Sequence, residues 1–398
     1  MSIFNSLGSN YDLEFVLKAL FSQNKSEYPK KLKELLQKKF QGKAILLYKG
    51  REAITLALKL LNLPHDSCVA INGLTCYAVY KAIKEAGLEP VLVDIPKDEL
   101  NFTRSDLVSI HSKNPEIKVV IIQNTLGYPC DIEEIAKICR GRNLILIEDL
   151  AHCVGTKYKT GKEAGTIGDL TIFSFSQDKI IDAVSGGAIV IRNKKFQNQK
   201  LPKFNNPSFG KTILDRFYPI LTWKIRVTYA FGVGKILHFI LRNLRLLSSP
   251  MDNSVYKLLN LPNFYQSLAL DSIKELKKNI EHRKKIANIY KKNLNKKIIS
   301  ERLNSQVNNS SNLRFPIFVN NREGLIKFLK NKGVYVSDIW YDAPIAPQRF
   351  MTKINYNNAC LNSEKISSLI LNLPTHKNIS EKNAVFITKR VNEWLKLQ

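Results

Sequence analysis

The sequence predicts an α/β fold with a mostly parallel central sheet covered by helices on both faces, followed by a smaller C-terminal α+β region. Two observations support this prediction. Short apolar runs alternate with helical stretches between residues 68 and 192, as expected for parallel strands buried on both faces. From about residue 265 the pattern changes to a long helix, a strand and another helix. The length of 398 residues allows two or three domains.

The N-terminal part of the chain is predicted to be helical. Residues 11–40 contain Leu and Phe side chains at helical spacing after Pro29, which favours a helix start. Ala and Leu dominate residues 51–63, directly after Gly50, and both are strong helix formers.

Six apolar runs are predicted to be strands, and they span residues 68–73, 90–95, 118–125, 144–149, 170–175 and 186–192. Helices are predicted at 76–87 and 131–142. In sheets of this kind, ligands bind outside the carboxyl ends of the strands. Polar residues at those ends are therefore the candidates for chemistry.

Changes of pattern divide the chain into three predicted parts. Residues 1–195 form a large domain, residues 196–262 form a basic, aromatic-rich insert, and residues 263–398 form the small C-terminal domain. The last part opens with a predicted helix at 267–294, which leads into a strand at 312–319 and a helix at 322–333.

Composition excludes several protein classes. With 44% hydrophobic and 24% charged residues, the chain is neither wholly disordered nor collagen-like nor a coiled coil. Lys and Arg outnumber Asp and Glu by 61 to 34, which gives a net charge of +27. Such an excess indicates a polyanionic partner, an anionic membrane surface or biased composition. No zinc-finger, helix-turn-helix or RNP-like motif is present, so we expect no nucleic acid partner.

The cysteine pattern and the N-terminus favour a cytoplasmic protein. None of the six cysteines forms a CxxC pair, and no Cys/His spacing suggests a metal site. Free cysteines in apolar runs fit a reducing compartment better than a disulfide framework. The first residues lack a signal-peptide pattern, and no apolar run is long enough to predict a transmembrane helix.

Three polar residues fall where predicted strands end. Asp149 closes one run, Ser174 lies within the next, and Lys179 follows shortly before Gly186 and Gly187. A lysine amine can form a Schiff base with pyridoxal phosphate, and a carboxylate can keep the cofactor's pyridinium nitrogen protonated. The helix that begins at Gly50 could offer amide N–H groups to the phosphate.

Each of these residues also has an ordinary structural interpretation. A lysine after a strand is commonly solvated, an aspartate at a strand end commonly caps a helix, and a glycine pair commonly marks a turn. Their order along the chain makes the joint functional interpretation much stronger than any single one.

In this order the chain resembles the DegT-type nucleotide-sugar aminotransferases, which are fold-type-I pyridoxal phosphate enzymes. The resemblance covers nearly the whole chain and includes QNTLGYPCDIEEIAKICRGRNLILIEDLAHCVGTKY, GTIGDLTIFSFSQDKIIDAVSGGAIVI and the late LNLPTHKNIS. Its specific part is the central segment from Glu148 and Asp149 to Lys179 and the glycine pair. The resemblance implies a homodimer with shared active sites, which transfers an amino group from an amino acid, most simply glutamate, to a keto-sugar on a nucleoside diphosphate. It thereby implies a role in cell-surface polysaccharide or amino-sugar biosynthesis.

The resemblance also assigns roles to individual residues. Lys179 matches the Schiff-base lysine and proton shuttle, and Asp149 the partner of the pyridinium nitrogen. His152 stands where the family often has Gln against the cofactor's ring hydroxyl, although a packed core histidine remains an alternative. Ser174 matches the phosphate-binding hydroxyl. Certain sugar 3-dehydratases of this fold have His at the lysine position, so Lys179 favours transamination.

Three positions depart from the family pattern. Gly50 and Arg51 match the phosphate-binding helix start, but Glu52 follows where a small or hydroxylated residue is usual, and we expect it to turn away. Where the family often has an aromatic residue to stack on the cofactor ring, this chain has Cys76 and then Tyr77. Both are candidate cofactor contacts.

The insert combines cations with apolar side chains. Residues 183–251 contain twelve Lys or Arg and one acid, Asp215. Such a mixture suits a segment that lies on an anionic membrane, and residues 211–247 are the candidate contact at the inner membrane face. The alternative is a substrate lid or dimer contact whose aromatic residues are buried. The alternative functions are transamination of a non-sugar substrate, and a non-catalytic relative that binds a membrane or polyanion.

Overall fold

The structure is a computed structural model that describes residues 2–22, 25–248, 257–357 and 359–398. Its centre is a seven-stranded sheet with the order β2-β9-β8-β7-β6-β3-β5. The strands are β2 (Lys43–Leu47), β3 (Cys68–Asn72), β5 (Glu89–Val93), β6 (Ile117–Ile122), β7 (Ile145–Asp149), β8 (Leu170–Ser174) and β9 (Gly187–Ile191).

The predicted mostly parallel sheet is confirmed. Strands β5, β3, β6, β7 and β8 run parallel, whereas β9 is antiparallel to both of its neighbours, β8 and β2. The strand β2, which lies between α2 (Tyr28–Phe40) and α3 (Gly50–Leu60), was not predicted from the sequence. This strand adds the edge beside β9.

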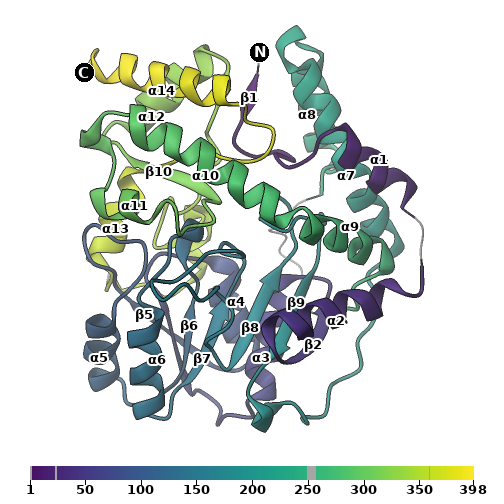
Figure 1. The fold of residues 1–398 in the computed structure, drawn as a ribbon, viewed down its shortest axis with the longest axis vertical. Coiled ribbons are helices and arrows are strands. Elements are labelled where there is room, and N and C mark those ends of the chain that lie inside the picture. The colour runs from purple at the N-terminus through teal and green to yellow at the C-terminus, as the bar shows by residue number, and fades with distance from the viewer. Residues whose placement is uncertain (1, 23–24, 249–256, 358) are drawn as a thin grey trace.

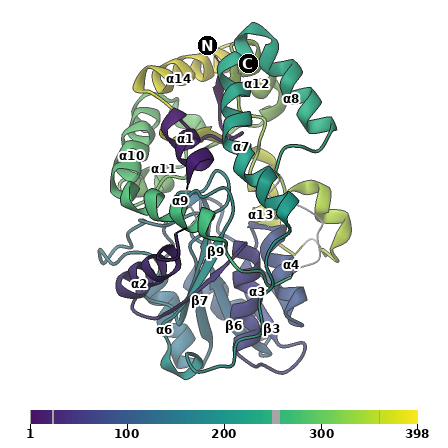
Figure 2. The same cartoon turned by 90° about the vertical axis from the view of Figure 1, so that its right-hand side faces the viewer.

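Helices cover both faces of the sheet, as predicted. Figure 2 shows the sheet nearly edge-on, with α2 (Tyr28–Phe40) and α6 (Ile132–Gly141) on one side and α3 (Gly50–Leu60) and α4 (Tyr77–Glu85) on the other. Helix α5 (Arg104–Lys113) packs beside α6. Side chains alternate between the two layers, so Ile147 of β7 joins the core under α3 whereas Leu146 joins the core under α6.

The C-terminal part is a smaller α+β region, as predicted (Figure 1). Strands β10 (Arg314–Phe318) and β13 (Ile370–Pro374) pair antiparallel. Around them lie the helices α9 (Asn263–Lys274), α10 (Leu276–Asn293), α11 (Glu301–Gln306), α12 (Arg322–Asn331), α13 (Leu361–Leu369) and α14 (Glu381–Leu395). The single helix predicted at 267–294 is in fact two helices, α9 and α10, separated at Glu275.

Two short strand pairs tie distant segments to this C-terminal region. Strand β1 (Ile3–Phe4) pairs with β11 (Val334–Tyr335), and β4 (Thr75–Cys76) pairs with β12 (Ile345–Ala346). The first residues of the chain and the start of α4 are thereby held beside residues 334–346. This arrangement brings segments from both ends of the sequence to the carboxyl edge of the sheet.

The insert forms a helical hairpin. Helix α7 (Phe209–Thr228) packs against α1 (Leu13–Phe21), and α8 (Val233–Asn243) folds back on α7 after Gly232, whose φ of 84° lies in the left-handed region. Figure 1 shows α8 at the end of the molecule away from α5 and α6. Within the described ranges, no helix has the length and apolar character needed to cross a bilayer.

The single acidic residue of the segment 183–251, Asp215, is fully buried. Its Oδ2 accepts hydrogen bonds from Tyr48 (2.5 Å), Ser185 (2.8 Å) and Tyr265 (2.9 Å), and its Oδ1 accepts one from Ser248. Four hydroxyl donors from separate segments therefore compensate the buried carboxylate and fix α7 to the large domain.

Candidate active site

Lys179 and Asp149 lie at the carboxyl edge of the sheet. Asp149 is the last residue of β7, and Lys179 lies in the loop after the neighbouring parallel strand β8. Burial lowers the pKa of the Lys179 ammonium, while the nearby Cys76 and Asp149 act in the opposite direction. The site therefore favours the neutral amine that nucleophilic and proton-transfer chemistry requires.

The Asp149 carboxyl is buried, and its Oδ1 accepts a hydrogen bond from the Ala151 N–H at 2.9 Å. Burial raises the Asp149 pKa to about 6, against the lowering effects of the Ala151 N–H and of the Lys179 charge. A cationic partner, such as a protonated ring nitrogen, would therefore favour the ionised form of this buried carboxyl.

The N-terminus of α3 lies directly against the ends of two strands. A Cβ at Gly50 would lie 2.8 Å from the Ser174 Cβ and 3.0 Å from its Oγ. A Cβ at Gly187 would lie 2.7 Å from Gly50 Cα. Because both glycines allow this close approach, the Ser174 hydroxyl lies beside the first residues of α3, at a helix N-terminus that could bind an anion.

The two charged residues after Gly50 behave differently. Glu52 is buried and turns toward the backbone of Leu259, whose N–H donates to Glu52 Oε2 at 3.1 Å. Burial raises the Glu52 pKa to about 7, so this carboxyl ionises less readily than an ordinary one. Arg51 is half-buried at the helix start, and its charge lowers the pKa of both Glu52 and Cys76.

His152 is buried and hydrogen-bonded through Nδ1. The Leu126 N–H points at this nitrogen over 3.4 Å, and the Tyr341 hydroxyl lies 2.9 Å away. Burial lowers the His152 pKa well below its usual range, and the Lys179 charge adds to this effect. The ring is therefore neutral, and the Leu126 N–H assigns its proton to Nε2, which leaves Nε2–H as a hydrogen-bond donor.

Cys76 and Tyr77 lie where β4 meets α4. Cys76 is the N-cap residue of α4, and its pKa is raised by burial and lowered by the Lys179 charge, so the thiol lies near the lysine. The Tyr77 ring instead stacks on Phe350, with the ring centroids 4.5 Å apart and the planes at 12°. Cys76 is thus the better placed of the two candidates, and cofactor contact by either residue stays a prediction.

The aromatic side of the site was not predicted from the sequence. The Trp340 ring stacks on His152 at 5.2 Å, and Lys179 Nζ lies 4.6 Å from the Trp340 ring centroid. The Tyr341 hydroxyl accepts a hydrogen bond from Gln123 Nε2 at 3.0 Å, in addition to its contact with His152. Residues 336–341 show no helix or strand periodicity, so no sequence signal marked them.

The N-terminal segment was also missed, and it holds the lysine loop. Ser9 donates from its backbone N–H (2.9 Å) and its hydroxyl (2.5 Å) to Asp178 Oδ1. Asn10 Nδ2 donates to the Lys179 carbonyl at 2.9 Å and to Asp182 Oδ2 at 3.0 Å. The first ten residues therefore position the backbone on both sides of the reactive amine.

These residues fit pyridoxal phosphate. An amine of lowered pKa and a buried carboxyl meet at one sheet edge, and the close contact of Gly50 with Ser174 puts a hydroxyl at the N-terminus of α3, where a phosphate could bind. In the parts of the chain that the structure describes, no cluster of three or more His, Cys, Asp or Glu is arranged to hold a metal ion.

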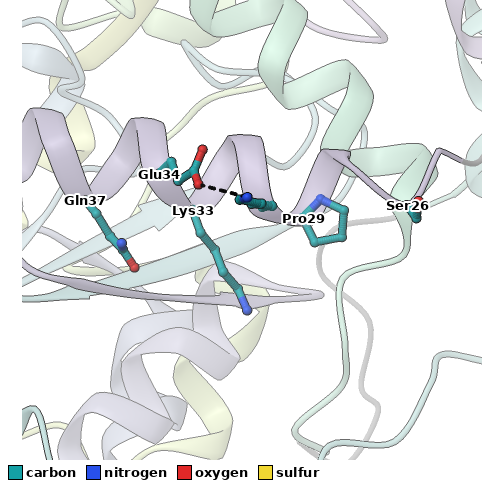
Figure 3. Close-up of a pocket in the computed structure, with 6 residues that line it drawn as sticks. Ser26, Pro29, Lys33, Glu34 and Gln37 are labelled. Atoms are coloured by element: carbon teal, nitrogen blue, oxygen red, sulfur yellow. Dashed lines mark ion pairs between the residues drawn. The ribbon is translucent and has the colours of Figure 1, made fainter.

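A separate hollow of about 450 Å³ lies on the outer surface of α2 (Figure 3). Its lining includes Lys30 and Glu34, whose charged atoms are 4.0 Å apart and whose side chains are exposed. None of the predicted site residues lines it. Because side chains of one helix and its N-terminal approach form this open hollow, the buried polar residues mark the active site instead.

Comparison with known proteins agrees with the geometry. The DegT/DnrJ/EryC1/StrS aminotransferase family profile matches residues 18–392. A GDP-perosamine synthase from Escherichia coli O157:H7 is 26% identical over 87% of this chain and 84% of its own length. A UDP-4-amino-4,6-dideoxy-N-acetyl-beta-L-altrosamine transaminase from Campylobacter jejuni is 26% identical over 86% and 83%, respectively.

Solved structures share the fold. The Helicobacter pylori aminotransferase PseC, described as involved in the biosynthesis of pseudoaminic acid, superposes with a TM-score of 0.72 at 16% identity, covering all of both chains. An E. coli GDP-4-keto-6-deoxy-D-mannose-3-dehydratase with bound hydrated pyridoxal phosphate also reaches 0.72, at 19% identity over 98% of this chain and all of its own. At such identities the likeness shows the fold alone.

Proposed function

Since the chain belongs to the DegT/DnrJ/EryC1/StrS family of pyridoxal phosphate-dependent aminotransferases, we propose that it transfers an amino group to a keto-sugar carried on a nucleoside diphosphate. The observation that carries this proposal is that Lys179, Asp149 and the contact between Gly50 and Ser174 lie at one sheet edge. The relatives of known activity act on nucleotide-linked sugars, which supports the substrate class. A role in cell-surface polysaccharide or amino-sugar biosynthesis follows from such a product.

The residues divide the work according to their chemistry. When bound, the cofactor supplies an aldehyde that accepts the amino group and a ring that withdraws electrons from the reacting carbon. Lys179 Nζ would hold the cofactor and, as a neutral amine, take up and return the proton at the reacting carbon. Asp149 would keep the ring nitrogen protonated, and the His152 Nε2–H would donate to the ring hydroxyl. Ser174, Gly50 and Arg51 would bind the phosphate.

Lys179 favours transamination over dehydration. The fold is shared with a 3-dehydratase, so the fold by itself does not choose between these reactions. The resemblance to the family places His at the lysine position in such dehydratases, whereas this chain has a lysine whose pKa is lowered by burial. An amine at this position can shuttle the proton that completes amino transfer.

A substrate screen tests the proposal. Holoenzyme is incubated with L-glutamate, the proposed donor, and a panel of 4-keto and 3-keto nucleotide sugars, and 2-oxoglutarate release is followed. Formation of an amino-sugar nucleotide with equimolar 2-oxoglutarate is expected. If amino acids react with the cofactor but every sugar nucleotide is inert while a simple keto acid is aminated, the nucleotide-sugar substrate is wrong.

The proposed enzyme is a homodimer with active sites shared between subunits, as the family resemblance implies. Sedimentation equilibrium tests the dimer directly. Mixing a Lys179→Ala chain with a chain defective in a second site residue tests whether sites are shared, since restored activity requires residues from both subunits. A fully active monomer would contradict the proposal.

The proposed docking surface is the α7–α8 hairpin, within residues 211–247. Several of its aromatic and aliphatic side chains are exposed in the single chain, among them Phe231 (82%) and Phe239 (67%). Lys235, Arg242 and Arg245 are exposed on or next to α8, whereas the one acid within residues 211–247, Asp215, is buried. Apolar side chains flanked by cations suit the headgroup region of an anionic bilayer.

Vesicle co-sedimentation separates the occupants of this surface. Binding to phosphatidylglycerol vesicles at low salt that weakens with added salt is expected, since exposed cations are screened. If the protein does not bind anionic vesicles, and hydrophobic substitutions on α8 instead change its oligomeric state, the hairpin is a subunit contact.

A further inference from the structure

Two arginines are buried in the C-terminal region, and they differ in their hydrogen bonds. Arg283 on α10 is 1% exposed, and each of its nitrogens has an acceptor. Its Nε donates to Asn279 (3.0 Å), its Nη1 to the Leu313 carbonyl (3.0 Å) and Thr375 (3.2 Å), and its Nη2 to Asn10 (2.9 Å). This arginine is a structural link between α10, β10 and the N-terminal segment.

Arg314, the first residue of β10, is 2% exposed, yet neither of its terminal nitrogens is satisfied. Within the described residues, Nη1 and Nη2 are both buried without a hydrogen-bond acceptor. Its nearest carboxylate, on the half-exposed Asp338, is 3.8 Å from Nη2, which is too long for a hydrogen bond. A buried guanidinium with two unpaired nitrogens is costly, so an anionic ligand would compensate it.

Arg314 and the reactive lysine lie near the same tryptophan ring. Its Cζ lies 4.8 Å from the Trp340 ring centroid, and Lys179 Nζ lies 4.6 Å from the same centroid. After burial and the opposing effects of nearby acidic groups, the Arg314 charge is a further cause of the Lys179 pKa shift, and it lowers the pKa. Trp340 is half-exposed, so movement of this one side chain would open the guanidinium to the site.

We propose that Arg314 binds the α-carboxylate of the amino donor, as a bidentate pair through Nη1 and Nη2, once Trp340 moves off the guanidinium. An α-amino acid carries its amine and its carboxylate on one carbon, so a group that binds the carboxylate must lie close to the lysine that the amine displaces. Two parallel N–H donors match the two oxygens of a carboxylate. This inference rests on the proposed aminotransferase function and adds the residue that selects the donor.

The test compares two donors that differ in one group. L-glutamate and 4-aminobutyrate are the same molecule except for the α-carboxylate. The cofactor spectrum of holoenzyme is followed after mixing with each donor, for wild type, Arg314→Met and Arg314→Lys. Arg314→Met should lower kcat/KM for L-glutamate roughly 10- to 100-fold, the range for a lost charge-assisted hydrogen bond, and leave 4-aminobutyrate within about twofold. Arg314→Lys should retain part of the kcat/KM for L-glutamate, because the lysine keeps the positive charge but not the two parallel N–H donors of the guanidinium.

A binding measurement gives a readout independent of turnover. Glutarate, which has the carboxylates of glutamate without its amine, is titrated calorimetrically into holoenzyme, and Arg314→Met should weaken its binding by a similar factor. Arg390→Met, a partly exposed arginine on α14, is the matched control and should change neither donor nor glutarate. Thermal unfolding of each variant establishes that it is folded.

The outcomes distinguish this inference from the proposed function. If wild type reacts with L-glutamate and Arg314→Met does so with unchanged kcat/KM, the inference is overturned and the aminotransferase function stands. If Arg314→Met weakens binding of UDP or GDP but not of glutarate, Arg314 serves the nucleotide diphosphate, and the inference is also wrong. If wild-type holoenzyme reacts with no amino acid, the proposed function itself fails.

Discussion

The active-site edge and the α7–α8 hairpin break the usual pattern of burial in opposite directions. At the sheet edge, Asp149 and His152 are buried although polar groups ordinarily face water. On the hairpin, Phe231 and Phe239 are exposed although such side chains are ordinarily covered. The buried polar residues indicate a reaction site, and the exposed aromatic residues indicate a surface that binds a partner.

Asp215 connects the two regions. Its carboxylate lies on α7, and its hydroxyl donors come from Tyr48, Ser185, Ser248 and Tyr265. Tyr48 precedes the Gly50 helix start by two residues, and Ser185 precedes the glycine pair that packs on it. The proposed docking surface and the proposed phosphate site therefore share one anchor.

The largest effect is expected at Asp149. In Asp149→Asn, the amide oxygen can still accept the Ala151 N–H, but the charge that would pair with the cofactor's ring nitrogen is lost. Removing such preorganised electrostatic stabilisation should lower kcat for the glutamate half-reaction about 10²- to 10³-fold. Stopped-flow absorbance of the cofactor measures the rate. An Asp149→Asn enzyme within threefold of wild type would remove Asp149 from the chemistry.

Glu52 should make stability depend on pH. Its folded pKa is about 7 against an ordinary value of 4.5, so the protonated carboxyl is favoured by folding. This contribution is fully present below about pH 4.5 and is lost as the pH rises through 7, with a total of about 3 kcal/mol. Relative to Glu52→Gln, which keeps an acceptor for the Leu259 N–H, wild type should lose stability over this range.

Urea unfolding of both proteins between pH 5 and pH 8 measures this difference. Parallel stability curves for wild type and Glu52→Gln would mean that the Glu52 carboxyl titrates normally.

Asp215→Asn should loosen the anchor between the regions. The amide nitrogen cannot accept the hydroxyl hydrogen bonds that one carboxylate oxygen receives, so we expect a loss of about 2 kcal/mol in the free energy of unfolding. The urea midpoint measures it, and Asp271→Asn, at an ion pair on the surface of α9, serves as the control. Equal midpoints for the two variants would argue against Asp215 as the anchor.

The smallest effect is expected on the hairpin. Phe239→Glu should weaken binding to anionic vesicles roughly tenfold, because burying one apolar side chain in the interface contributes about 1.5–3 kcal/mol. Val385→Glu, at a similarly exposed apolar side chain on α14, should leave binding unchanged. If both substitutions act alike, the binding is non-specific, and the contrast between the regions loses its functional meaning.

The sequence predicted the parts of the molecule that have a regular pattern or a fixed order. The buried parallel strands could be read from continuous apolar runs, and Asp149 and Lys179 from their positions at the ends of two such runs. Trp340 and Arg314 could not be found this way, because they reach the site through tertiary packing of the C-terminal region. Ser9 contacts Asp178 and Asn10 contacts Lys179, each across 169 residues, and no local pattern encodes these contacts.

The insert shows the same limit of sequence-based prediction, here for apolar side chains. Its composition indicated an interfacial segment, but composition does not tell which apolar side chains are exposed. The structure separates the buried Tyr218 and Ile225, which pack inward from α7, from the exposed side chains of α8. The net charge of +27 is thus informative about the surface of the protein, whereas the buried groups at the sheet edge are informative about its reaction.

The central claim, that Lys179 holds pyridoxal phosphate and carries the amino transfer, has a direct test. Holoenzyme is reduced with sodium borohydride, digested and analysed by mass spectrometry, with Lys179→Ala as the control. We expect one peptide that carries a reduced pyridoxyl phosphate on Lys179. The Lys179→Ala protein should give no such peptide and no amino transfer. A modified peptide elsewhere in the chain, or a Lys179→Ala enzyme as active as wild type, would contradict it.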